Sequence, residues 1–526
     1  MKDKTLLLFL LLCGLFAKGQ TIEVSSLQSG VWEADTVLIT GDVVVEDSLR
    51  ITSGTTVLFD SFYSITVKQD ASLKALGAKN DSILFTIADT TGFHIYNSGR
   101  GGWNGIRLSK AGCCQFDYCR FQYGKAAIDD DQDGGALRIR MSDDVNISHS
   151  TLFCNFSREH GGALYAEDSK VGIHDCKVCN NLTYSRVDTI YFMYGGGMHF
   201  RRSEVELTGG DFHHNTGETA IGGAVCFDSC AVIIDRCKFE YNYGINGGAL
   251  YLIDSYDQPC SITNSLFAHN TSGHFGGGFA IRNSSPLIAN LTVADNHSIG
   301  VNCGGIFFYQ ESSPILWNCI VYGNTNESVA EMPVQMWTWT YDDHAPEFHN
   351  CLVQYGLENI ASYDRITVYE NCIDEDPMFY DDSYLIVDHS SPCYNGGSPD
   401  TPAEILNGFD LNGNPRVWDG IIDMGAYEMG ETGMQETARY EPLVHIVGNP
   451  ITASSYAEIE LESSGHLAAL LITTDGKLVQ RKDWGKLPSG VNRIELGTLF
   501  APLPSGTYLL VLQASGHTFT AKAVKP

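Results

Sequence analysis

The chain has 526 residues, with 33 basic and 63 acidic side chains and a formal net charge of −30. A surface this acidic repels nucleic acid and anionic lipid, which excludes both as partners, and it disfavours uronate polymers unless a divalent cation bridges the two anions. The length exceeds that of one ordinary globular core, but a solenoid avoids this limit because it grows along one axis.

The first 19 residues predict a secretory signal peptide. Lys2 and Lys4 precede the apolar run from Leu6 to Phe16, and Ala17-Lys18-Gly19 offers small residues at the cleavage positions. No later run reaches the roughly 18 apolar residues that a membrane-spanning helix needs. We therefore expect a secreted chain whose mature part has no transmembrane anchor.

Residues 22 to about 110 predict the first coils and the cap of a solenoid. Short apolar runs such as Val43–Val45, Leu49–Ile51 and Val57–Phe59 alternate like strands, and turns such as Ser53-Gly54-Thr55 separate them.

Two short signatures recur down the middle of the chain. One is a Gly-Gly pair before small and apolar residues, as in Gly161-Gly162-Ala163-Leu164, and it returns at Gly134, Gly195, Gly222, Gly247, Gly276 and Gly304. The other is an apolar residue three before an Asn, as in Phe212 to Asn215, Phe239 to Asn242 and Phe267 to Asn270. A period of about 25 to 35 residues, with apolar runs too short for helices, indicates a solenoid of strands.

Each repeat is interpreted as one coil of about three short strands, and successive coils are expected to pair in parallel at roughly 4.8 Å. The Gly-Gly pair marks a turn whose neighbour comes too close for a Cβ. The repeating Asn suits a tight turn in which its amide can bond the Asn of the next coil. The sequence thus predicts an all-β chain with a parallel β-helix over residues 20–430 and regular coils at about 119–372.

Six cysteines share one repeat position, which other repeats fill with Ser150, Gly210, Ser265 or Leu291; they are Cys119, Cys176, Cys237, Cys319, Cys351 and Cys372. A position that accepts all these residue types favours a small, inward-facing stack of free cysteines. Secretion favours the alternative of disulfides, which the coil spacing also permits.

The composition and the apolar pattern of the sequence change near the C-terminus. Residues 431–443 are polar and lack apolar periodicity, which predicts a linker. From residue 444 to 526 there is no cysteine, and short apolar runs alternate with turns such as Asp475-Gly476 and Pro504-Ser505-Gly506. This pattern predicts a small antiparallel β-sandwich as a second domain.

The Gly-Gly-Ala-Leu and Phe-x-x-Asn signatures, over residues 119–324, resemble the repeats of chlamydial polymorphic outer-membrane proteins and of bacterial right-handed β-helix proteins in general. The segment with Asn414-Pro415-Arg416 and Asp423-Met424-Gly425-Ala426-Tyr427-Glu428 is similar to the end of β-helices from secreted bacterial surface proteins. These resemblances imply a right-handed solenoid and specify the fold better than the function.

The last 80 or so residues resemble the type A C-terminal sorting domain of the type IX secretion system. The matching features are Gly448-Asn449-Pro450, Asp475-Gly476-Lys477, Gly490-Val491-Asn492, Gly506-Thr507-Tyr508 and Lys522-Ala523-Val524-Lys525-Pro526. Gly448 stands where that family usually has proline. The resemblance implies the type IX machinery as a partner of residues 444–526, export across the outer membrane, and a place at the cell surface.

Three insertions interrupt the repeats, before Gly134, before Gly195 and after Asn324, and they are expected to project from one face of the solenoid. The middle one carries flat aromatic side chains suited to stacking on sugar rings, namely Tyr184, Tyr191, Phe192 and Tyr194. They are our candidate ligand-binding residues. Simple surface decoration is the alternative. Trp337 and Trp339 are interpreted as packing residues, because the repeat register aligns Trp339 with Phe307.

A calcium site is a weaker candidate. Asp129, Asp130, Asp131 and Asp133 supply hard oxygen ligands for Ca²⁺, and a solvated acidic loop is the alternative that the pattern favours. Asp410-x-Asn412-x-Asn414 begins like a calcium loop but has Pro415 in place of the required Gly, and we reject it.

No catalytic constellation is evident across neighbouring repeats. We therefore expect a non-catalytic, adhesin-like β-helix that binds an extracellular polysaccharide or a host or surface glycan. A polysaccharide lyase or glycoside hydrolase is the alternative, and a purely structural surface-layer role is a third. Catalytic residues are not assigned.

Overall fold

The computed structural model describes residues 20–429 and 444–525 with short gaps: 129–131, 186–192, 301, 328–333, 342, 363–364, 382–384, 399, 407, 419, 448–450, 452–454, 462–464, 474–477, 489 and 515–516. The predicted signal peptide (1–19) and linker (431–443) lie outside the described residues, as do Asp129, Asp130, Asp131, Tyr191 and Phe192.

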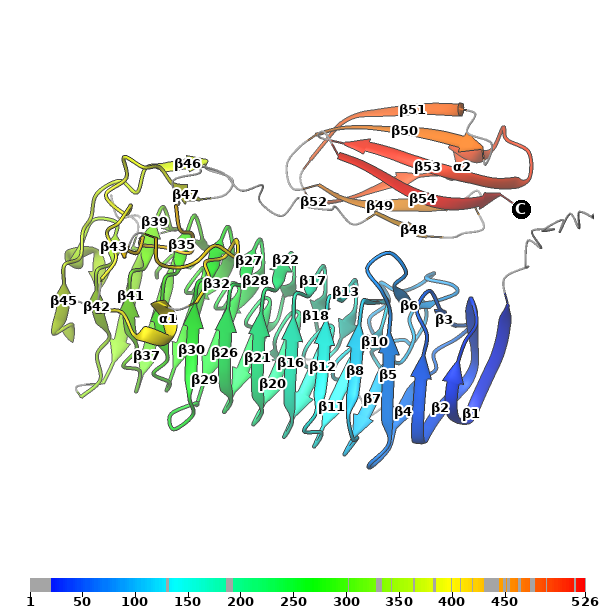
Figure 1. Cartoon of the computed structure of the whole chain (residues 1–526), viewed down its shortest axis with the longest axis horizontal. Helices are drawn as coiled ribbons and strands as arrows, with labels where there is room; N and C mark the ends of the chain where they lie inside the picture. The colour runs from blue at the N-terminus through cyan, green and yellow to red at the C-terminus, as the bar shows by residue number, and fades with distance from the viewer. Residues whose placement is uncertain are drawn as a thin grey trace, which may run out of the picture.

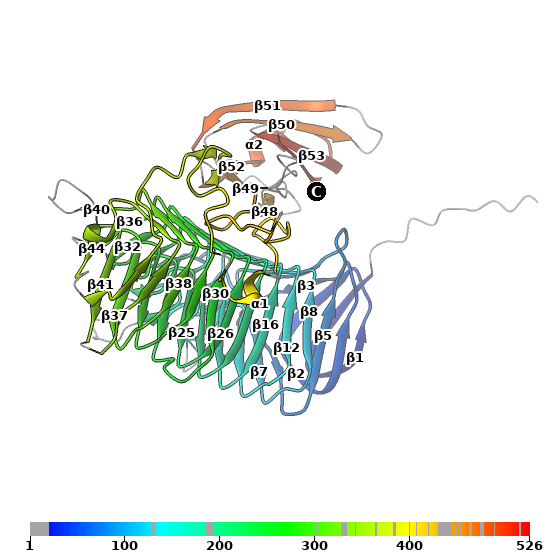
Figure 2. The same cartoon turned by 60° about the vertical axis from the view of Figure 1, so that its left-hand side comes forward.

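Residues 21–370 form a parallel β-helix whose coils stack along one axis, from β1 at one end to β45 at the other (Figures 1 and 2). The first coils contain long strands that turn through several faces of the solenoid. Their bounds are β1 Thr21–Trp32, β2 Thr36–Ile51, β3 Thr56–Phe59, β4 Ile65–Val67, β5 Ser72–Leu76 and β6 Ile83–Ile87.

Each regular coil contributes one strand to each of three parallel sheets. Alternate residues of each strand point into the core that the three sheets share. The first sheet follows the Gly-Gly turns: β7 Ile106–Ser109, β11 Leu137–Arg140, β15 Leu164–Glu167, β20 Met198–Arg201, β25 Val225–Asp228, β29 Leu250–Ile253, β33 Phe279–Arg282, β37 Ile306–Gln310, β41 Met336–Thr340 and β44 Ile360–Ala361.

The second sheet comprises β8 Cys114–Asp117, β12 Val145–Ser148, β16 Lys170–His174, β21 Glu204–Thr208, β26 Ala231–Asp235, β30 Cys260–Thr263, β34 Leu287–Ala289, β38 Ile315–Trp317, β42 Glu347–His349 and β45 Val368–Glu370. The third comprises β9 Cys119–Gln122, β13 Thr151–Phe153, β17 Lys177–Cys179, β22 Asp211–His213, β27 Lys238–Glu240, β31 Leu266–Ala268, β35 Thr292–Ala294, β39 Ile320–Tyr322 and β43 Leu352–Val353.

Short strands return the chain from the third sheet to the next Gly-Gly turn. They are β10 Lys125–Ala126, β14 Phe156–Ser157, β18 Leu182–Thr183, β23 Thr216–Gly217, β28 Tyr243–Asn246, β32 Thr271–Phe275, β36 His297–Ser298 and β40 Thr325–Asn326. Beside them, β19 Met193–Tyr194 pairs with β24 Ala220–Ile221, and η1 spans Leu357–Asn359.

The recurring asparagines form the predicted ladder. Asn242 donates from Nδ2 to Oδ1 of Asn270 at 2.9 Å, and Asn270 donates in the same way to Asn296 at 3.0 Å. The same bonds run from Asn155 to Asn324, where Gln335 takes the last place. These side chains are buried, and each also bonds to backbone groups of the neighbouring coil. Because hydrogen bonds are stronger in a buried environment, the ladder fixes the geometry of the turn from coil to coil.

The shared cysteine position faces the core, as its register predicts. Cys119, Cys176 and Cys237 are each at most 1% exposed, and no disulfide joins the described cysteines from Cys113 to Cys393. The γ atom at this position accepts a hydrogen bond from a backbone N–H of the preceding coil. Ser150 Oγ accepts from Cys119 N at 2.9 Å, and Cys351 Sγ accepts from Cys319 N at 3.4 Å. This shared role explains why Ser and Cys alternate there.

The segment after the last coil folds back over the third sheet (Figure 1). It contains β46 Phe379–Asp381, β47 Ile386–Val387 and α1 Ala403–Leu406. Gly425 N donates to Asn318 O at 2.8 Å, and Ala426 N donates to Thr292 Oγ1 at 3.0 Å. The outward side chains Leu266 and Ile320 are buried beneath it, so this closing segment covers coils whose outer face is apolar.

The closing segment is held by buried polar groups of the Asn-Pro-Arg and Gly-Ala-Tyr-Glu motifs. Arg416, fully buried, donates from Nη2 to the carbonyls of Asp423 and Gly425 at 3.0 Å and lies 3.4 Å from Glu428. The carboxylate of Asp410 accepts a hydrogen bond from the backbone N–H of Asn414 at 2.6 Å and thereby stabilises the turn between them.

Residues 444–525 form an antiparallel sandwich with a core of its own, lined by Ile459, Leu471, Leu510 and their neighbours. One sheet contains β48 Val444–Val447, β49 Tyr456–Leu461 and β52 Gly490–Glu495. The other contains β51 Leu478–Leu487, β50 Gly465–Thr473, β53 Gly506–Ala514 and β54 His517–Lys525, and α2 spans Gly497–Phe500. Within the described part of the chain, the helices are too short or too polar to cross a bilayer.

Candidate functional site

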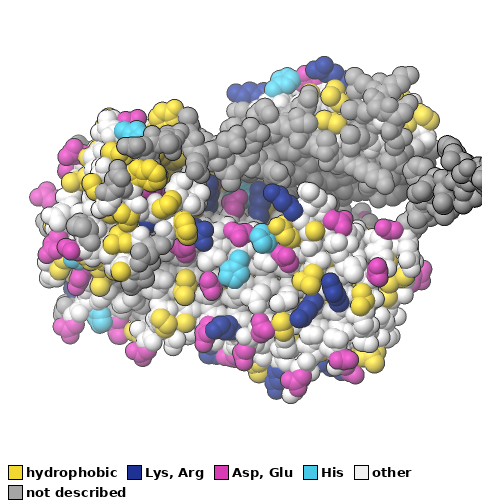
Figure 3. All heavy atoms as spheres, in the orientation of Figure 1, with side chains coloured by type: hydrophobic (Ala, Val, Ile, Leu, Met, Phe, Trp, Pro, Cys, Tyr) yellow, Lys and Arg dark blue, Asp and Glu magenta, His cyan; other side chains and the backbone are white. Residues whose placement is uncertain are grey.

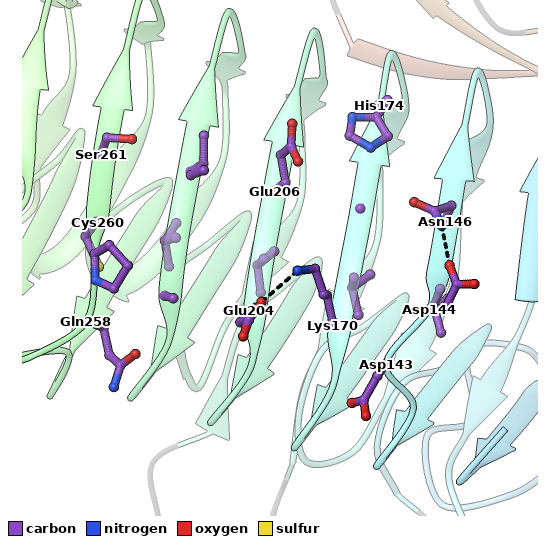
Figure 4. A pocket seen from close by; sticks show the side chains of 18 of the residues that line it. Asp143, Asp144, Asn146, Lys170, His174, Glu204, Glu206, Gln258, Cys260 and Ser261 are labelled. Carbon is purple, nitrogen blue, oxygen red and sulfur yellow. Dashed lines mark hydrogen bonds and ion pairs between the residues drawn. The ribbon is translucent and has the colours of Figure 1, made fainter. Parts of the chain in front are cut away.

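A groove of about 710 Å³ runs across the outer face of five adjacent strands of the second sheet, β12, β16, β21, β26 and β30 (Figure 4). This face is turned to the viewer in Figure 3, where acidic, basic and histidine side chains are interspersed over the coils. The polar side chains that line the groove are Asp143, Asp144, Asn146, Lys170, His174, Glu204, Glu206, Gln258 and Ser261.

Strand register sorts these side chains into rows that run along the solenoid. Lys170 pairs with Glu204, and Asp144 occupies the same position one coil earlier, immediately before β12. The next outward position along the strands is filled by Asn146, Gly172 and Glu206 in β12, β16 and β21, and then by Ile233 in β26. Since neighbouring parallel strands lie about 4.8 Å apart, Asp144, Lys170 and Glu204 lie at nearly the same height on three consecutive coils.

The glycine in this row shapes the floor of the groove. A Cβ on Gly172 would lie 2.6 Å from Nε2 of His174 and 2.9 Å from Oδ1 of Asn146. The missing side chain therefore lets the imidazole and the amide close in over the backbone. His174 is oriented from the far side, where its Nδ1 lies 2.7 Å from Oγ1 of Thr208.

The electrostatic character of the groove is acidic. Lys170 Nζ lies 2.9 Å from Glu204 Oε2, and the hydrogen bond to Glu204 is the main reason that the pKa of Lys170 is raised. Both side chains are 66% exposed, so the pair is solvent-screened. With one lysine against four carboxylates, the groove favours neutral or cationic ligands over anions.

The short bulge before β30 lines part of the groove. Gln258 and Pro259 line the groove there, and the carbonyl of Pro259 accepts the backbone N–H of Val232 at 3.0 Å. The groove itself was missed, because its side chains belong to no repeated motif.

The two predicted ligand-binding tyrosines that the structure describes lie in different surroundings. Tyr184 lines a separate pocket. Tyr194 is partly buried against the outer side of the first sheet, where its ring stacks on His199 at 5.1 Å between centroids. The structure therefore does not bring these two side chains together, and neither lines the groove.

The register prediction for the tryptophans is wrong by two residues. Phe307 pairs with Trp337, and Trp339 pairs with Tyr309 and is 54% exposed. The physical reason is that Val334 and Gln335 take the places of both glycines: Gly304 N donates to Val334 O at 2.9 Å, and Gly305 N donates to Gln335 O at 3.0 Å. Counting from a Gly-Gly pair fails where the pair is replaced.

One mixed cluster has potential metal-ligand atoms. Oxygen or nitrogen atoms of Asp133, Glu159 and His160 lie within 4.8 Å of one another, and burial lowers the pKa of His160 to about 4. However, His160 Nδ1 accepts the backbone N–H of Tyr194 at 3.2 Å, which leaves the proton of the neutral ring on Nε2. Arg140 lies 3.3 Å from Asp133 and supplies a competing cation. These contacts favour a polar network over a metal site.

Comparisons with known proteins identify the fold. A family model described as "Right handed beta helix region" matches residues 135–326 and 223–376. The coils are therefore those of a right-handed parallel β-helix.

Two individual proteins are also similar. "Metabotropic glutamate receptor-like protein R" of Dictyostelium discoideum is 26% identical over 177 residues, which are 33% of this chain and 10% of that protein. The enzymatically active domain of tailspike protein 4 from bacteriophage CBA120 is 12% identical, with a TM-score of 0.22 over 92% of this chain and 60% of that chain. The chain spans 10% of the length of the first protein and 60% of the second.

Proposed function

We propose that this protein is a secreted, surface-exposed β-helix that binds a neutral polysaccharide in the groove over β12, β16, β21, β26 and β30. The observation that carries the proposal is the register of polar groups on successive coils, from Asp144 and Asn146 through Lys170 and His174 to Glu206. Carboxylate and amide oxygens accept hydrogen bonds from hydroxyl groups. A polysaccharide lying along the solenoid would meet polar side chains on the three consecutive coils of β12, β16 and β21.

A hydrolase is the second candidate, because Asp144 and Glu204 lie two coils apart, or roughly 10 Å between backbones. Inverting glycosidases hold two carboxyl groups about 6.5–9.5 Å apart. Both carboxylates are exposed here, whereas the general acid of such enzymes usually lies in apolar surroundings. Lys170 is a poor candidate for the base of a lyase, since its raised pKa keeps it protonated. Binding without catalysis is therefore favoured.

A blocking substitution tests the groove. Ile233 is 50% exposed in the groove, and Ile315 occupies the same row outside it and is 38% exposed. We expect Ile233→Arg to weaken retention of a neutral polysaccharide by about tenfold or more, because the long side chain fills the groove, and Ile315→Arg to change it little.

The measurement is affinity electrophoresis against a panel of neutral and acidic polysaccharides, with released reducing ends assayed in the same samples. Equal retention by Ile233→Arg and the unmodified protein would remove the groove as the binding surface. Release of soluble products would favour the hydrolase.

We further propose that residues 444–526 direct export through the type IX machinery and that the β-helix is displayed at the cell surface. The proposal rests on the sorting-domain resemblance and on the separate core of the sandwich. Deleting residues 444–526 is expected to trap a folded β-helix in the periplasm. Cell fractionation combined with surface protease treatment checks this, and a truncated chain that still reached the surface would contradict it.

A further inference from the structure

A second cavity, of about 580 Å³, lies on another side of the same coils and shares no lining residue with the groove. Its walls come from the loop before β7 and from the chain just after β14, β18 and β23. The polar and aromatic side chains that line it are His94, Tyr96, Asn97, Arg158, Tyr184 and Glu218.

Strand register places three of these residues in a row. Ser157 pairs with Thr183, and Thr183 pairs with Gly217. Arg158, Tyr184 and Glu218 are the residues that follow, so they occupy one position on three consecutive coils. With coils about 4.8 Å apart, a cation and an anion flank the tyrosine ring along the solenoid.

The opposite wall is held in place by a buried lysine. Lys125 Nζ donates to the carbonyls of Phe93 at 2.8 Å, Ile95 at 3.0 Å and Arg100 at 2.9 Å. Burial lowers the pKa of Lys125 to about 8, so the ammonium remains largely protonated at neutral pH and can keep these bonds. The loop that carries His94, Tyr96 and Asn97 is thereby fixed over the coils.

Aromatic contacts complete the wall. The ring of Tyr96 stacks on Phe156, with centroids 4.7 Å apart, and meets Tyr184 edge to face at 5.3 Å. These contacts lie within the chain itself and fix the position of Tyr96, and a fixed wall reduces the entropy lost on binding.

We propose that this cavity binds a sugar unit that carries a carboxylate, such as a hexuronate. Arg158 would pair with the carboxylate, Tyr184 would contact the apolar face of the ring, and Glu218 would accept hydrogen bonds from hydroxyl groups at the other end. The volume is in the range of small-ligand pockets, about 300–1,000 Å³.

The net charge of the chain is compatible with this ligand if only one unit enters the cavity. A polyuronate would also meet the acidic surface beyond the cavity, whereas a single carboxylate at Arg158 is screened from charges more than about 8 Å away at physiological salt. The cavity therefore suits the end of a chain or a free sugar. This inference does not depend on the function proposed for the groove.

Two matched pairs of sugars test the inference: galacturonate against galactose, and glucuronate against glucose. Binding to the full chain is measured by titration calorimetry and by ligand-observed NMR. We expect a uronate to bind about tenfold or more tightly than its neutral counterpart, and Arg158→Gln to abolish that difference. Arg236→Gln, a surface substitution outside both cavities, and Ile233→Arg should retain it.

Three results would overturn the inference: no binding of either uronate, equal affinity for charged and neutral sugars, or an unchanged preference in Arg158→Gln. Thermal unfolding of each variant shows whether the coils remain intact. If Arg158→Gln proves unfolded, Tyr184→Ala replaces it as the deciding variant, with a loss of about tenfold in uronate affinity expected.

Discussion

Replacing Gly248 with alanine is expected to lower the free energy of unfolding of the β-helix by about 4 kcal/mol or more. Losses this large occur when a substitution creates a severe packing conflict. A Cβ at this position would lie 2.0 Å from the carbonyl oxygen of Gly277 and 2.8 Å from backbone atoms of Thr271. Backbone atoms of adjacent coils cannot turn aside as a flexible side chain can, so the stack would have to open.

A matched substitution separates this effect from the general cost of losing a glycine. Gly273 lies in the same coil, and a Cβ there would make only ordinary contacts, the nearest at 3.5 Å. Gly273→Ala should therefore unfold at nearly the same denaturant concentration as the unmodified protein. The account of the Gly-Gly turn fails if chemical denaturation finds Gly248→Ala as stable as Gly273→Ala.

Replacing Asn270 with leucine is expected to cost about 4 kcal/mol or more, because several buried polar groups lose their partners at once. The side chain donates to Phe239 O at 2.8 Å and to Asn296 Oδ1 at 3.0 Å. Its own Oδ1 accepts from both the backbone N and the side-chain Nδ2 of Asn242 at 2.9 Å. Each unsatisfied buried group costs about 1–3 kcal/mol.

Asn146→Leu is the matched control, since Asn146 lies on the outer face, where its side chain donates a hydrogen bond to Asp144 at 3.0 Å. Its expected cost is below about 1 kcal/mol. Equilibrium denaturation compares the two variants. Similar midpoints for Asn270→Leu and Asn146→Leu would mean that the ladder contributes little beyond its packing.

The sequence was sufficient for the architecture because the same backbone constraint returns in every coil. The carbonyl oxygen of Gly277 leaves no room for a side chain at Gly248, and Asn242 bonds Asn270 as Asn270 bonds Asn296. Such constraints act inside a turn and allow few residue types, so they appear as motifs. The all-β class and the parallel coils followed from them, whereas the C-terminal sandwich followed from short apolar runs that alternate with turns.

The groove could not be predicted in the same way, since outward side chains are not constrained by the coil above. Asp144, Lys170 and Glu204 differ in type, and no catalytic constellation was recognised among them. A signal was present in the spacing: Lys170 and Glu204 each lie nine residues after the first glycine of their coil, Gly161 and Gly195. Counting outward positions would have aligned these two side chains, whereas Asp144 lies ten residues after Gly134 and falls outside the count.

The closing segment was predicted only as the end of the β-helix, with no indication of where it packs. Its position over the third sheet depends on outward apolar side chains, among them Leu266 and Ile320, which are buried beneath it. An outward apolar run on consecutive strands signals a covering element. The sequence gives no direct indication of which segment supplies the cover, because Thr292 and Ala426 meet across 134 residues.

Hydrogen–deuterium exchange with and without a retained neutral polysaccharide tests the central proposal most directly. We expect slower exchange on ligand addition in β12, β16, β21, β26 and the bulge before β30, with the face behind them unchanged. Protection confined to another face, or to the sandwich at 444–525, would contradict the assignment of the groove as the binding surface.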